Sequence, residues 1–111
     1  MDISDAELIL RDATINSDGT YTILRLGQDP GVEALHSLYS ALHLIRRRYA
    51  DDQYIPHQIA YYCGIILNFA SECLQNLKSK GAAKHLFHSV YDLEMAAFNT
   101  LAGRIADEWS V

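Results

Sequence analysis

Two histidines and an aspartate, His85, His88 and Asp92, follow one another at intervals of three and four residues. In a helix this spacing places the three side chains on one face. Two imidazoles and a carboxylate could together hold Zn²⁺ or another divalent metal. The opposite side of the same helix carries apolar residues such as Val90 and Leu101. The triplet is therefore expected on a solvated face, without the dry cavity that metal catalysis needs, and we predict no metal site.

The remaining histidines lie at the edges of predicted helices. His36 and His43 are seven residues apart and flank Tyr39, while His57 begins a later segment. Boundary histidines of this kind usually hydrogen-bond to backbone or water. The spacing gives no reason to group them as ligands.

Cysteine is the other residue type that could do chemistry. Cys63 and Cys73 are ten residues apart on one predicted helix, which separates them by about 15 Å, beyond disulfide reach. Both fall on the apolar face and are expected to be core thiols. The sequence contains no Gly-x-Ser-x-Gly elbow and no glycine-rich phosphate loop. We therefore expect no catalytic residue, no cofactor and no enzymatic activity.

Glu94 falls among apolar residues of the last predicted helix, next to Leu93 and near Ala97. An unpaired carboxylate in that position would carry a heavy desolvation cost. The sequence predicts a buried polar pair of Glu94 with Arg46, or with a tyrosine hydroxyl. The alternative is that Glu94 faces a cleft and, with the histidines, serves a small metal-dependent helical enzyme.

Three predicted helices would position these residues. The central helix, residues 56–80, is the most apolar segment, and the third helix spans residues 82–109. The first helix, residues 29–50, is expected to begin with Asp29 as its cap and Pro30 at its first position. Its narrow apolar seam is predicted to pack against the central helix; the seam consists of Leu35, Leu38, Leu42, Ile45 and Tyr49.

The first 28 residues allow two interpretations. Ser4 and Glu7 have the spacing of a capping box, which favours a short helix, whereas residues 8–16 could equally form a strand. Residues 17–19 read Ser-Asp-Gly, a turn signal, and residues 20–26 are β-branched and aromatic. We predict a single mostly helical α+β domain over residues 1–111, with an N-terminal β-hairpin followed by a three-helix antiparallel bundle. The alternative is an all-α bundle with a short first helix.

The formal net charge of −5 is concentrated in the first third of the chain. Residues 1–33 contain seven acidic residues and only two arginines. Nucleic acid is therefore not expected as a partner, and an acidic face is better suited to a basic protein surface. The acidic N-terminus is unlike a signal peptide, and no apolar run reaches the roughly 20 residues of a membrane span. A cytoplasmic protein without membrane contact is expected.

These observations favour a non-catalytic protein-binding module, such as an inhibitor, an immunity-type protein or an adaptor. A structural subunit of a larger assembly is a further alternative. Exposed aromatic residues commonly anchor protein interfaces. The expected partner-binding residues are Tyr21, Glu33, Tyr54, Tyr61 and Ile65.

The third predicted helix also suggests self-association. Its apolar residues drift around the helix axis, so Phe98, Ile105 and Trp109 have no obvious neighbour within one chain. A self-complementary apolar patch closes most readily as a two-fold dimer. We predict a homodimer with these three residues at its interface.

Overall fold

The computed structural model describes residues 1–52 and 54–109, with side chains described as far as Ala102. Four long helices and one short helix make up the regular structure of this part of the chain, which contains no strand. They are α1 (Ile3–Ile15), α2 (Thr20–Arg25), α3 (Val32–Tyr49), α4 (His57–Ser79) and α5 (Lys84–Trp109). The predicted β-hairpin is therefore wrong, and the all-α bundle that was the alternative is the observed architecture.

Helix α1 replaces the first predicted strand. The carboxylate of Asp2 accepts a hydrogen bond from the backbone N–H of Asp5 at 2.9 Å, and the Asp5 carboxylate accepts one from the Asp2 N–H at 3.5 Å. This capping box begins two residues earlier than the predicted one and satisfies two otherwise unpaired donors. Ala6, Leu10 and Ala13 follow at intervals of four and three and are all buried. The segment thus has both a helix start and a helical apolar face.

Helix α2 replaces the second predicted strand. An alternating strand would place Tyr21 and Ile23 on the same side, but the two buried residues are Tyr21 and Leu24, three positions apart. The hydroxyl of Tyr21 donates a hydrogen bond to the backbone carbonyl of Ile66 in α4. Burial against α4 has overridden the β propensity of this short segment, as tertiary contacts commonly do.

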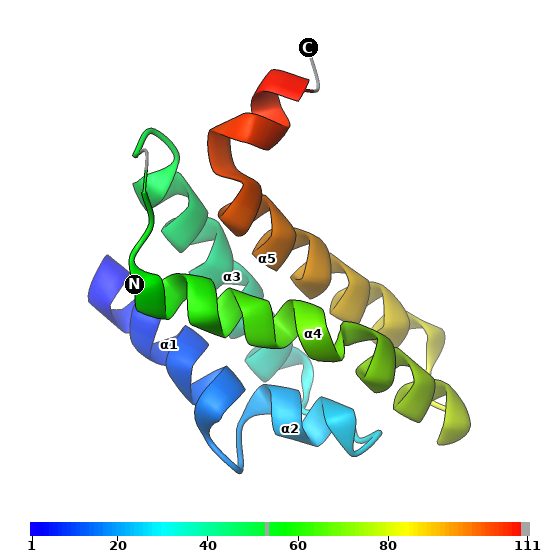
Figure 1. The fold of residues 1–111 in the computed structure, drawn as a ribbon. Coiled ribbons are helices and arrows are strands. Elements are labelled where there is room, and N and C mark those ends of the chain that lie inside the picture. The colour runs from blue at the N-terminus through cyan, green and yellow to red at the C-terminus, as the bar shows by residue number, and fades with distance from the viewer. Residues whose placement is uncertain (53, 110–111) are drawn as a thin grey trace.

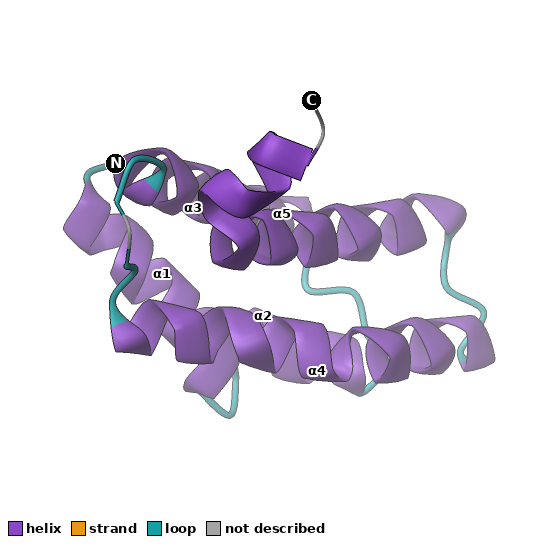
Figure 2. Cartoon of the chain, turned by 45° about the horizontal axis from the view of Figure 1, so that its top comes forward, coloured by secondary structure: helices purple, strands orange, loops and turns teal. Residues whose placement is uncertain are grey.

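The four long helices form a closed ring in the order α1, α3, α5, α4 (Figure 1), because each helix packs against the next and α4 returns to α1. Helix α2 packs against both α1 and α4. In Figure 2, α3 and α5 form one layer and α4 and α2 the other, with α1 at one end. The expected packing of the 29–50 helix against the central helix is corrected: α3 packs mainly against α1 and α5.

Helix α3 begins later than expected. Its N-terminal cap is Gly31, and Asp29 instead accepts a hydrogen bond from the Gly31 N–H at 2.8 Å, ahead of the first helical residue Val32. At the other end, the hydroxyl of Tyr49 donates to the carboxylate of Glu7 at 3.0 Å. This bond joins the end of α3 to the start of α1, as expected for two neighbouring antiparallel helices.

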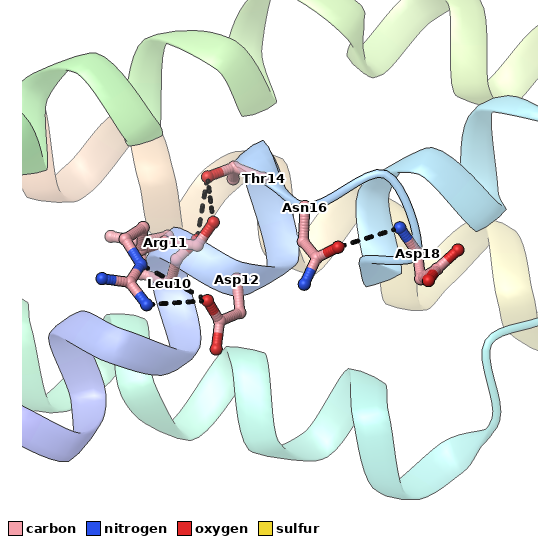
Figure 3. A network of polar contacts seen from close by, with 6 residues as sticks. All are labelled: Leu10, Arg11, Asp12, Thr14, Asn16 and Asp18. Carbon is pink, nitrogen blue, oxygen red and sulfur yellow. Dashed lines mark hydrogen bonds and ion pairs between the residues drawn. The ribbon is translucent and has the colours of Figure 1, made fainter.

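A short polar network closes the connection between α1 and α2 (Figure 3). The side-chain carbonyl of Asn16 accepts from the Asp18 N–H at 3.2 Å, and the Thr14 hydroxyl donates to the Leu10 carbonyl at 2.9 Å. A Cβ atom at Gly19 would lie 2.3 Å from the carbonyl oxygen of Asp12. Only glycine allows the chain to pass so close to the end of α1.

The core is formed by the inward faces of all these helices. In α4 it contains Ile59, Cys63, Ile66, Ala70, Cys73 and Leu77. The described part of the chain includes no helix that is both long and apolar enough to cross a bilayer. The helices are thus arranged around a shared apolar centre, which leaves their outer faces for contacts with other molecules.

Candidate functional site

Large apolar side chains remain exposed on two outer surfaces of the bundle. One lies where α1 packs beside α4, and its exposed side chains include Leu8 (46%) and Tyr61 (58%). The other lies along α3 and α5, and its exposed side chains are Val32, Tyr39, Tyr91, Met95 and Phe98. Because burial of apolar surface drives folding, apolar groups gathered on a surface mark contact sites.

The first surface, called here the α1/α4 surface, contains a hollow of about 210 Å³. Its lining consists of Ser4, Glu7, Leu8 and Arg11 from α1 and Gln58, Ile59 and Tyr62 from α4. The ring of Tyr61 lies beside that of Tyr62, with the ring centroids 5.9 Å apart. The lining of the hollow thus mixes apolar and aromatic side chains with polar and charged ones, and the polar ones predominate.

The α1 side of this hollow carries one acidic and one basic side chain, Glu7 and Arg11. Arg11 makes an ion pair with Asp12 at 3.2 Å, and both side chains are about half exposed, so the pair contributes little stability. Burial, followed by the hydrogen bond to Glu7, raises the pKa of Tyr49. The Glu7 carboxylate is therefore held at the rim of the hollow by an uncharged partner, and Arg11 is the basic residue among the lining side chains.

The expected partner-binding residues do not form one group. Tyr61 and the half-buried Ile65 lie on α4 near the hollow, and Tyr54 is exposed in the loop before α4. Glu33 is exposed in the first turn of α3, which does not line the hollow. Tyr21 is only 2% exposed and belongs to the core, so it is not available to a partner.

A second groove, less polar than the α1/α4 hollow, runs between α3 and α5. Two adjoining hollows of about 230 and 110 Å³ share Tyr39 and Asp92. His36 lines the larger hollow and His43 the smaller one, and the rings of Tyr39 and His43 are 5.4 Å apart. No three metal-ligating side chains come together among the described residues.

The pairing of Glu94 with Arg46 stays a prediction. Both side chains are only partly buried. Arg46 lines the groove between α3 and α5, where the α5 residues are Asp92, Met95, Ala96 and Asn99. Glu94 lies on the opposite flank of α5, toward α4. Burial, and to a smaller extent the charge of Glu94, raises the pKa of Tyr21.

Both cysteines are buried free thiols. Burial raises the pKa of Cys63 to about 12 and that of Cys73 to about 11. The thiolate, which is the reactive form, is therefore suppressed at neutral pH. Neither thiol lines the hollows described above.

Phe98, the first residue of the predicted dimer interface, is 49% exposed on the outer side of α5. Ile105 and Trp109 lie outside the residues whose side chains are described.

Sequence reasoning missed Leu8 and Tyr62 as members of a site. Leu8 lies on the side of α1 opposite the buried Ala6, Leu10 and Ala13, so a helical interpretation of this segment would have marked it as exposed. Its proximity to Tyr62 depends on the packing of α1 against α4. Comparisons of the chain with protein-family models, curated proteins and solved structures find no match.

Proposed function

We propose that this chain is a non-catalytic, cytoplasmic protein-binding module of the inhibitor, immunity-type or adaptor class, and that it binds through the α1/α4 surface. The observation that carries the proposal is the hollow in which Leu8 and Tyr62 meet, with the exposed Tyr61 beside it. Partly exposed tyrosines around an apolar centre are typical of interface hot spots.

The size of the hollow supports a protein partner. At about 210 Å³ it is smaller than the 300–1,000 Å³ typical of small-molecule pockets. It has room for one or two side chains of a partner, while the surrounding faces of α1 and α4 supply the rest of a contact. This geometry fits an anchor side chain better than an enclosed ligand.

The charge around the hollow defines the partner. Helix α1 and its cap carry Asp2, Asp5, Glu7 and Asp12 against the single Arg11; of these, Glu7 and Arg11 line the hollow, and Asp12 lies on the flank that faces α3. A partner with a basic surface would be attracted to this side, chiefly through faster association. The partner therefore combines an apolar anchor with surrounding lysines or arginines. The predicted homodimer concerns a different surface, the outer side of α5.

The test is affinity capture from the protein's own cell with the purified full chain. A specific partner should be retained at low salt and released by about 1 M salt, which shortens the Debye length to about 3 Å. Tyr61→Ala is expected to weaken the purified complex by about 2 kcal/mol, roughly 30-fold in Kd, as for a hot-spot tyrosine. Leu8→Ala should weaken it in the same direction.

The matched controls are Tyr91→Ala and Leu26→Ala, which remove similarly exposed side chains away from the α1/α4 surface. Both variants should bind the partner as the unchanged protein does. Equal losses for Tyr61→Ala and Tyr91→Ala would refute the assignment of the surface. Retention of a small molecule with no protein partner would refute the binding-module proposal itself.

A further inference from the structure

Helix α5 has a second apolar face that the bundle does not cover. Tyr91, Met95, Phe98 and Ala102 follow at intervals of four, three and four residues, and the first three are exposed. They lie opposite the buried face of the same helix, which consists of Leu86, Val90, Leu93, Ala97 and Thr100. This set of four residues is called here the outer seam of α5.

The spacing of the outer seam is that of a coiled-coil heptad. In the sequence the same alternation of three and four continues to Ile105 and Trp109, whose side chains are outside the described residues. The spacing of the buried face, continued past Thr100, instead reaches the charged Arg104 and Asp107. The sequence therefore maintains the outer apolar pattern beyond the point where the inner one stops.

We propose that a second copy of this chain packs its α5 along the outer seam, with the two helices parallel, to form a reversible two-fold dimer. The heptad spacing lets identical residues of the two helices meet layer by layer, so the seam is complementary to itself. The interface is separate from the α1/α4 surface and leaves the hollow there open.

The charges beside the seam favour the parallel arrangement. In a parallel pair, a residue flanking one side of the seam faces the residue five positions later on the other helix. Glu94 would then face the partner's Asn99, which lies in the same hollow as His43. Both side chains can donate hydrogen bonds to a carboxylate. Within its own chain, Glu94 interacts electrostatically with the buried Tyr21.

In an antiparallel pair, the same side of each α5 helix would face its counterpart on the other copy. The Glu94 side of one helix would then face the Glu94 side of the other, where Leu101 is the neighbouring residue on the same flank. A carboxylate against leucine has no donor and loses hydration. Charge and hydrogen bonding thus select the parallel orientation.

The exposed area sets the strength of the dimer. Tyr91 and Phe98 are each about half exposed, and an aromatic side chain buries about 150–250 Å², so these two offer roughly 200 Å² per copy. Even with the smaller contributions of Met95 and Ala102, this is below the roughly 800 Å² per partner of a standard interface. We therefore expect a weak, reversible dimer rather than a permanent one.

Sedimentation equilibrium of the full chain, from about 1 to 100 μM, tests the proposal. The apparent mass should rise with concentration from 12.5 kDa toward twice that value. Met95→Glu places a charge in the middle of the seam at a side chain that is already 38% exposed, so folding should persist. This variant should dimerise at least tenfold more weakly, while the control Leu8→Glu, on the α1/α4 surface, should dimerise normally.

Orientation is tested by cross-linking Tyr91→Cys under mild oxidation, since the native cysteines are buried. A parallel dimer brings the two introduced thiols together and should yield a covalent dimer. A mass of 12.5 kDa throughout the concentration range, or an unaffected dimer in Met95→Glu, would overturn the proposal. A dimer that does not cross-link through position 91 would overturn the parallel arrangement. None of these results depends on the partner of the α1/α4 surface.

Discussion

Removing the hydroxyl of Tyr21 is the most direct test of how the N-terminal third is folded. Tyr21 is 2% exposed, and its hydroxyl donates to the backbone carbonyl of Ile66 in α4. Because α2 has only six residues, its position depends on such contacts rather than on intrinsic helix stability. Tyr21→Phe removes the hydrogen bond and keeps the ring.

The expected loss follows from the geometry. A buried hydrogen bond between uncharged groups contributes about 1 kcal/mol net, so Tyr21→Phe should lower the free energy of unfolding by that amount and Tm by about 4 °C. Tyr21→Ala also removes the ring and should cost about 3–5 kcal/mol, as other buried aromatic truncations do. That is a large part of the roughly 5–15 kcal/mol total of a typical domain.

Urea unfolding followed by circular dichroism measures both changes. Tyr54→Phe, at a side chain that is 79% exposed, is the matched control and should change stability by less than about 0.5 kcal/mol. If Tyr21→Phe were indistinguishable from Tyr54→Phe, and Tyr21→Ala cost less than about 1 kcal/mol, the docking of α2 on α4 through Tyr21 would be wrong.

Three further predictions concern glycines and thiols. Gly64→Ala should raise the urea midpoint, with a gain of about 0.5–1 kcal/mol, because Gly64 lies inside α4 and an added Cβ has no atom within 4 Å. Gly27→Ala should destabilise the protein more than Gly81→Ala, although both glycines have positive φ. A Cβ atom at Gly27 would lie 2.5 Å from a side-chain atom and 2.9 Å from a backbone carbonyl oxygen, whereas a Cβ atom at Gly81 would have no atom within 4 Å. Equal urea midpoints for the two variants would contradict this prediction. Stability should also fall above about pH 9, because unfolded thiols lose their protons there while burial keeps the pKa of Cys63 at about 12 and of Cys73 at about 11. Urea midpoints at pH 7 and pH 10 test the sign, and a smaller decrease is expected for Cys73→Ala.

Long helices were the most predictable elements. In α4, residues such as Ile59, Cys63, Ile66 and Ala70 recur at helical spacing over about three turns, and the structure buries all four. The same holds in α3 for Leu35, Leu38, Leu42 and Ile45. A pattern that long cannot be mistaken for the two-residue repeat of a strand.

The N-terminal third was mispredicted for a related reason. Helix α2 has six residues, too few turns to distinguish a helical from an alternating pattern, and its β-branched composition favoured a strand. The helical start of α1 depended on the capping pair of Asp2 and Asp5, whereas the sequence also offered Ser4 and Glu7 with similar spacing. Local preference alone did not select between these alternatives.

The sequence indicated the types of residue in the candidate site but not which residues come together to form it. Acidic charge near the N-terminus and surplus tyrosines were visible in the sequence, but Tyr21, which was assigned to the partner-binding residues, is buried. Leu8 and Tyr62 are 54 positions apart, and nothing local links them. They line one hollow because α4 packs beside α1.

The sequence by itself determined the helical character of α3, α4 and α5, the acidic first third and the outer seam of α5, because periodicity and charge are properties of consecutive residues. Tertiary structure alone decided that the N-terminal segment is helical, that α3 packs on α1 and α5, and that Leu8 meets Tyr62. These outcomes depend on which apolar faces cover one another. Burial energy summed over several helices exceeds the small local preferences of any single short segment.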